Sequence, residues 1–76
     1  MKELVEVMAK ALVDHPEEVV VTEHEDKGDL IVELKVAPSD MGKVIGRQGR
    51  IAKAIRAVVK AASARSDQRV VVDITQ

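Results

Sequence analysis

The first fourteen residues show the hydrophobic spacing of one face of a helix. Leu4, Met8 and Leu12 recur at intervals of four residues, with glutamate and lysine side chains between them. This spacing predicts an amphipathic helix over residues 3–14. Pro16 is expected to end the helix, because the residue before a proline avoids the α conformation.

Two stretches with the composition of β-strands follow. Residues 18–25 include a run of β-branched side chains, which suit a pleated surface. In residues 30–36 every second side chain is Leu or Val, which is the period of a strand with one buried face. Gly28 lies between them and can adopt the positive φ that a tight turn requires. The two strands are therefore predicted to pair as an antiparallel hairpin.

The second half of the chain predicts two helices and a final strand. Pro38-Ser39-Asp40 ends the second strand and offers an N-cap to a short helix at about residues 40–45. A longer helix is predicted from after Gly49 to about Ala64, because its apolar residues recur three and four positions apart. Alternating valine and isoleucine then predict a strand over residues 69–74.

The resulting order αββααβ predicts the fold class. A chain of 76 residues allows one domain. The crossover of two helices is long enough to bring the third strand back parallel to the second. We therefore expect an α+β domain in which a three-stranded mixed sheet carries the helices on one face.

Composition excludes several classes of protein. The chain has no cysteine, so it has no thiol chemistry, and a cytoplasmic location is expected. No signal peptide and no apolar run of membrane-spanning length is recognisable, so we expect no membrane association. Phe, Tyr and Trp are also absent, and bases therefore cannot stack on aromatic side chains as they do in several RNA-binding folds.

The overall charge of −1 conceals a strong segregation of charge. Residues 1–41 carry four Lys and Arg against eleven Asp and Glu, a net charge of −7. Residues 42–65 carry seven Lys and Arg and no acidic residue, a net charge of +7. Such a block fits a surface that binds a polyanion, and it also fits an ordinary solvated helix face.

The motif Gly46-Arg47-Gln48-Gly49 lies in this basic block, between the two predicted helices. Two glycines three positions apart favour a tight turn with little side-chain bulk, which lets the backbone approach a ligand. The turn also opens the longer helix, whose free N–H groups and positive dipole end favour an anion. The candidate nucleic-acid-binding residues are the motif and its neighbours: Lys43, Ile45, Gly46, Arg47, Gln48, Gly49, Arg50, Ile51 and Lys53.

Within this set the cations are expected to meet phosphates, and Ile45 and Ile51 are expected to floor an apolar groove that receives bases. Two other interpretations stay open. The glycines could only punctuate a turn between helices, and the two isoleucines could belong to the core. Residue types do not distinguish RNA from single-stranded DNA, because a contact to the 2′-hydroxyl leaves no mark in the sequence.

No catalytic or metal-ligating set is apparent. His24 lies between Glu23 and Glu25, but neighbours along a strand point to opposite faces and make a poor metal cage. No Ser/His/Asp or Cys/His combination and no nucleotide-binding glycine motif is present. We therefore expect no enzymatic activity, no cofactor and no metal.

The element order and the motif together resemble the KH domain in its bacterial type II form, whose Gly-X-X-Gly loop clamps the backbone of about four nucleotides. The resemblance covers nearly the whole chain and is nearest to the small single-KH proteins of the KhpA (YlqC) family. It implies that Gly46 and Gly49 shape the loop, and that Arg47 and Gln48 face the phosphates. It also places Val32 or Val36 near the base groove.

The resemblance implies a domain division as well: a KH core at about residues 29–76, preceded by the N-terminal helix and first strand in residues 1–28. It implies a non-enzymatic protein that holds single-stranded RNA as an RNA chaperone or post-transcriptional regulator. The implied partners are a second copy of the chain or a larger Jag-like KhpB protein, with a link to cell shape and division.

Two alternative functions remain. One is a protein–protein adaptor whose KH fold serves dimerisation, with the acidic and basic regions complementing each other. The other is a ribosome-associated assembly factor, which would still bind RNA.

Overall fold

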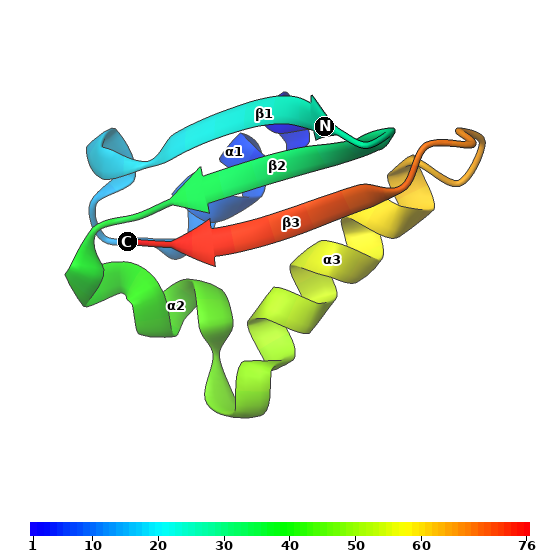
Figure 1. The fold of residues 1–76 in the computed structure, drawn as a ribbon. Coiled ribbons are helices and arrows are strands. Elements are labelled where there is room, and N and C mark those ends of the chain that lie inside the picture. The colour runs from blue at the N-terminus through cyan, green and yellow to red at the C-terminus, as the bar shows by residue number, and fades with distance from the viewer.

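The computed structural model describes all residues 1–76 and has the predicted order of elements (Figure 1). The helices are α1 (Lys2–Leu12), α2 (Met41–Ile45) and α3 (Arg50–Ala62), and the strands are β1 (Val20–Asp26), β2 (Asp29–Lys35) and β3 (Val70–Thr75). Single turns of 3-10 helix precede β1 (Pro16–Glu18), α2 (Pro38–Asp40) and α3 (Arg47–Gly49).

The three strands form one mixed sheet with β2 in the centre. β2 pairs antiparallel with β1 and parallel with β3, so that Leu34 lies opposite Val21 on one side and Ile74 on the other. The helices all lie on one face of this sheet, and the other face is open (Figure 1). The predicted α+β class and topology are confirmed.

The open face of the sheet is acidic at its centre. Glu33 of β2 lies directly opposite Asp73 of β3, and both side chains are exposed. His24 of β1 adds a partner on this face, with its Nδ1 3.8 Å from Glu33 Oε1. Most cations of the basic block lie on α2 and α3, so Glu33 and Asp73 are on the opposite side of the sheet from them (Figure 1).

The boundaries of two N-terminal elements differ from the prediction. α1 ends at Leu12 and Val13 is already extended, with φ −94° and ψ 160°. The next two backbone N–H groups, of Asp14 and His15, donate to the two carboxylate oxygens of Asp40 at 3.1 and 3.0 Å. The chain then forms the 3-10 turn at Pro16–Glu18, so β1 begins later than expected.

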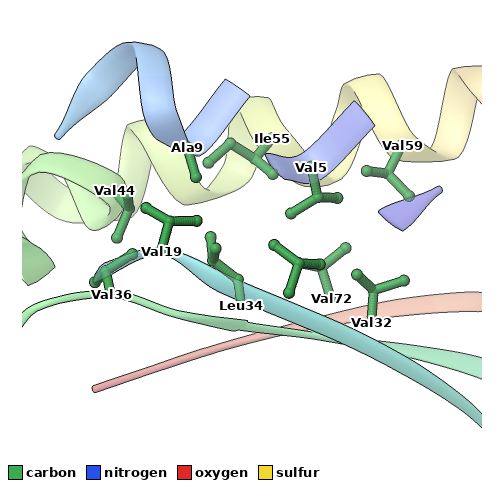
Figure 2. Close-up of a cluster of buried hydrophobic side chains, with 11 residues drawn as sticks. Val5, Ala9, Val19, Val32, Leu34, Val36, Val44, Ile55, Val59 and Val72 are labelled. Carbon is green, nitrogen blue, oxygen red and sulfur yellow. The ribbon is translucent and has the colours of Figure 1, made fainter. Parts of the chain in front are cut away.

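The core lies between the sheet and the helices and consists of small aliphatic side chains (Figure 2). Its buried members are Val5, Ala9, Val19, Val21, Val32, Leu34, Val36, Val44, Ile55, Val59 and Val72. α1 contributes Val5 and Ala9 to the same cluster that holds Val44 of α2 and Ile55 of α3. The helices on both sides of the Gly-X-X-Gly loop are therefore anchored on one core.

One expectation about the base groove was wrong. Val32 and Val36 are 0% and 1% exposed, and both belong to this core. They lie on the helix-covered face of β2 and at its end, where other side chains cover them completely. They therefore cannot line a groove that is open to a ligand.

Candidate nucleic-acid interface

The Gly46–Gly49 segment forms a tight connection between α2 and α3. Gly46 ends α2 with φ 77° and ψ 172°, and its N–H donates to the Gly42 carbonyl at 2.9 Å. Arg47, Gln48 and Gly49 form one 3-10 turn, closed by a 3.1 Å hydrogen bond from Gly49 N to Gly46 O. α3 begins at the following residue. The predicted tight turn between the two helices is therefore confirmed.

Positive φ angles recur throughout the turn. Gln48 has φ 57° and Gly49 has φ 74°, so three of four residues in the motif, counting Gly46, have left-handed φ values. A Cβ atom on Gly46 would lie 2.6 Å from Cγ1 of Ile51, which is too close for a non-bonded contact. Gly46 is thus required by the close packing of the turn against the first turn of α3.

Side chains of the motif that could contact a ligand point into solvent. Arg47 and Gln48 are exposed, whereas Gly46 and Gly49 are half-buried. The first turn of α3 contains no acidic residue, and α3 is 13 residues long, so its positive dipole end is not neutralised locally. Exposed side chains beside the N-terminus of a helix form a surface that favours an anion such as a phosphate.

The cations near the loop differ in whether they have a partner. Arg47, Arg50 and Lys53 are exposed and form no ion pair with an acidic side chain. Lys43 of α2, in contrast, is hydrogen-bonded and ion-paired to Asp14. This hydrogen bond lowers the pKa of the Asp14 carboxyl below its ordinary value and raises the pKa of the Lys43 ammonium group.

Ile45 and Ile51 take an intermediate position between core and surface. Both are half-buried and pack against the hydrophobic core. Ile51 also packs beneath the backbone of Gly46. The two interpretations that the sequence left open are therefore not exclusive, because each isoleucine packs against the core and keeps part of its surface accessible.

A groove that the sequence did not indicate lies between α3 and β3. It has a volume of about 550 Å³, and its lining includes Arg56, Lys60, Ser63, Gln68, Arg69 and Val72. Arg56 spans it, because its Nε and Nη2 donate to the Val72 carbonyl at 3.2 and 3.1 Å. β3 is an edge strand whose Arg69 and Thr75 carbonyls accept hydrogen bonds from the β2 side, so the Val72 carbonyl, of opposite parity, points away from the sheet. The groove thus adds three basic side chains, two on α3 and one directly before β3.

A second groove, of about 470 Å³, lies between α1 and α3 and is almost entirely apolar. Its lining includes Met8, Leu12, Ile51, Ala54, Ile55 and Val58. Val58 and Leu12 keep 44% and 38% of their surface exposed, which is high for large apolar side chains in a domain with so small a core. Arg50 is the charged residue of this lining.

Element order, topology and the Gly-X-X-Gly turn between two helices define the class of protein: this is a type II KH domain. The same fold occurs in a crystal structure of Era in complex with MgGDPNP and nucleotides 1506–1542 of 16S ribosomal RNA. The TM-score is 0.62 at 16% sequence identity, and the match covers 97% of this chain and 28% of the Era chain. At that identity the likeness concerns the fold alone.

Sequence comparison identifies the family. The family model "KhpA/KhpB, KH domain" matches residues 2–74. The RNA-binding protein KhpA of Clostridium perfringens is 64% identical over 74 residues, covering 97% of this chain and 99% of the relative. KhpA of Listeria monocytogenes is 47% identical over 76 residues, covering all of both chains. The chain belongs to the KhpA/KhpB family of KH domains, a non-enzymatic family, as the sequence predicted.

None of the helices combines the length and the apolar content that crossing a bilayer requires.

Proposed function

We propose that this protein binds single-stranded RNA, and that the Gly46–Gly49 turn holds the RNA backbone. The observation that carries the proposal is an exposed, acid-free turn at the N-terminus of α3, with Arg47 and Gln48 pointing into solvent. Such a turn offers backbone N–H groups and a positive dipole end to phosphates without any aromatic side chain. Its relatives in Clostridium and Listeria are named RNA-binding proteins.

The contacts are assigned by position along the site. Arg47 and Gln48 face the phosphates, Arg50 and Lys53 extend the positive surface along α3, and Lys43 extends it along α2. Ile45 and Ile51 give the loop an apolar flank beside the bases. The groove between α3 and β3 lies farther along α3 and carries Arg56, Lys60 and Arg69.

A single module of this size engages few phosphates, so its affinity depends strongly on salt and its sequence specificity is low. We therefore propose a role as an RNA chaperone or post-transcriptional regulator in the cytoplasm, in which the whole chain acts as one domain. Residues 29–76 carry the RNA site. Residues 1–28 complete the core beneath it through Val5 and Ala9.

The test is a titration of end-labelled single-stranded RNA at low and moderate salt. We expect an Arg47→Asp, Gln48→Asp double variant to lose most of the binding while circular dichroism shows the wild-type fold. A control variant with Lys2→Asn and Lys27→Asp changes the net charge by the same amount away from the loop, and it should bind nearly as well as the wild type. Equal losses in both variants would assign binding to overall charge and would refute the loop assignment.

We further propose that the protein pairs with a second copy or with a KhpB-like KH protein, and that the apolar groove between α1 and α3 takes part. Val58 and Leu12 are exposed within this apolar surface, and an exposed apolar patch of this kind supports the interface. Pairing would double the number of RNA sites and so raise the effective affinity. It would also support the adaptor function if RNA binding proved to be absent.

A further inference from the structure

The ion pair between Asp14 and Lys43 joins an acidic side chain to one of the proposed RNA-binding cations. Lys43 lies on α2, three residues before Gly46, and Asp14 lies in the connection between α1 and β1. The other cations proposed to flank the loop, Arg47, Arg50 and Lys53, have no acidic partner. A single member of the site is therefore neutralised within the protein itself.

Asp14 is held at this place by the fold. Its backbone N–H and that of His15 donate to the two carboxylate oxygens of Asp40, at 3.1 and 3.0 Å. Asp40 is 1% exposed and directly precedes α2, the helix that carries Lys43. The same buried carboxylate thus fixes the Asp14 backbone relative to α2, and the side chain of Asp14 reaches the lysine from a constrained position.

The pair itself remains at the surface. The side chains of Asp14 and Lys43 are 68% and 44% exposed, so either one can exchange its partner without leaving a buried charge behind. A carboxylate and a phosphate both accept hydrogen bonds from an ammonium group, and each can replace the other on Lys43.

We propose that the Asp14 carboxylate occupies Lys43 in the RNA-free protein and competes with the RNA backbone for it, which lowers RNA affinity. This inference rests on the proposed function, because it concerns the regulation of the same site. Asp14 acts here as an internal substitute for a phosphate, and Asp40 is the positioning residue that keeps it in place. Binding that uses Lys43 must first displace Asp14.

The size of the effect follows from counterion release. Each phosphate that a protein neutralises on a single strand contributes about 0.7 to the slope of log affinity against log salt concentration. Freeing Lys43 adds one such contact at most. Over the tenfold dilution from about 1 M to about 0.1 M salt, a slope of about 0.7 corresponds to an affinity gain of about fivefold.

Asp14→Asn is the variant that tests the proposal, because it removes the charge and keeps the shape and the backbone N–H that Asp40 binds. We expect it to bind labelled single-stranded RNA about fivefold more tightly at about 0.1 M salt, with a slope steeper by about 0.7. Asp26→Asn, at the β1–β2 turn, makes the same change in net charge and should leave both quantities nearly unchanged. In a Lys43→Gln background, Asp14→Asn should no longer have any effect.

The salt slope separates competition from a merely structural role, because a change in fold stability does not add a phosphate contact. The proposal is overturned if Asp14→Asn binds no more tightly than the wild type, or if its gain persists in the Lys43→Gln background. The Arg47→Asp, Gln48→Asp variant in the same titration distinguishes failure of this inference from failure of the proposed function. If that variant loses binding and Asp14→Asn has no effect, this inference alone is wrong. If the wild type does not bind RNA, the proposed function falls and this inference with it.

Discussion

Replacing Gly46 with alanine is expected to be among the most destabilising single changes in this protein. With φ 77° and ψ 172°, Gly46 occupies a backbone region that is accessible almost only to glycine. Forcing another residue to adopt such a conformation costs about 1–3 kcal/mol. The added Cβ would also lie 2.6 Å from Cγ1 of Ile51, and inserting an atom into a packed site costs about 1–3 kcal/mol more.

We therefore expect Gly46→Ala to lower the free energy of unfolding by about 2–6 kcal/mol. Domains are stable by roughly 0.05–0.15 kcal/mol per residue, so the loss is a large part of the total for a chain of this length. Variant molecules that remain folded should have a displaced loop, and RNA binding should fall further than the folded fraction does.

Two other glycines provide matched controls within a few residues. Gly49 has φ 74° and ψ 15°, and a Cβ there would contact nothing within 4 Å. Gly49→Ala should therefore cost only the left-handed conformation, about 1–2 kcal/mol. Gly42 lies within α2 at an ordinary helical φ with free space around it, so Gly42→Ala should be neutral or stabilise the protein by up to about 1 kcal/mol.

The assay is urea denaturation followed by far-ultraviolet circular dichroism, since the chain has no Trp or Tyr to report by fluorescence. The expected order of stability is Gly42→Ala, wild type, Gly49→Ala and Gly46→Ala, from most to least stable. If Gly46→Ala costs no more than Gly49→Ala, the contact with Ile51 does not constrain the loop, and the reasoning is refuted.

Three further predictions concern the buried Asp40 carboxylate, the Asp14–Lys43 ion pair and the apolar groove between α1 and α3. Asp40→Ala removes the acceptor of the Asp14 and His15 N–H groups and should lower the free energy of unfolding by about 2–3 kcal/mol in urea denaturation. An unchanged midpoint would show that the carboxylate does not stabilise this connection. Lys43 lowers the pKa of Asp14 in the folded state, so the stabilisation from this pair is present above the ordinary aspartate pKa and is lost as pH falls through the lowered value. The stability difference between wild type and Lys43→Gln should therefore be constant near neutral pH and shrink as the pH falls below about 4, and a difference that does not shrink on acidification would contradict the ion pair. Val58→Asp should shift a self-associated species to the monomer in light scattering without changing the helix content, while an unchanged mass in a self-associating wild type would exclude the α1–α3 groove as the interface.

Local sequence patterns were sufficient for most of the fold. Alternation in β2 and the three-and-four spacing in α3 identify their elements because each pattern reflects burial of one face against the core. The predicted element boundaries were wrong where a residue distant in sequence determines where the element ends. The end of α1 depends on Asp40, which lies 26 residues after Asp14, and no local pattern signals that contact.

In the candidate site, the glycine turn was predictable from the local sequence, whereas side-chain contacts to distant residues were not. Gly46 and Gly49 are visible as spaced glycines, and their positive φ angles explain why they are needed. The sequence predicts a helix cap from Pro38-Ser39-Asp40, but α2 has no side-chain cap hydrogen bond, because the Asp40 carboxylate accepts from the α1–β1 connection instead. The role of Arg56 in the groove was missed as well, since its acceptor, the Val72 carbonyl, is brought beside α3 only by the crossover to β3.

The separation of charge between the open sheet face and the helices also has a kinetic consequence. The acidic pair Glu33 and Asp73 lies on the uncovered face, and the basic residues lie on α2 and α3. A polyanion that approaches the sheet is repelled, whereas one that approaches the helices is attracted, so the protein rotates into a productive orientation during diffusion. Encounters with RNA should accordingly be fast at low ionic strength. Each molecule should engage a strand from one side only, which leaves the sheet free while the RNA is bound.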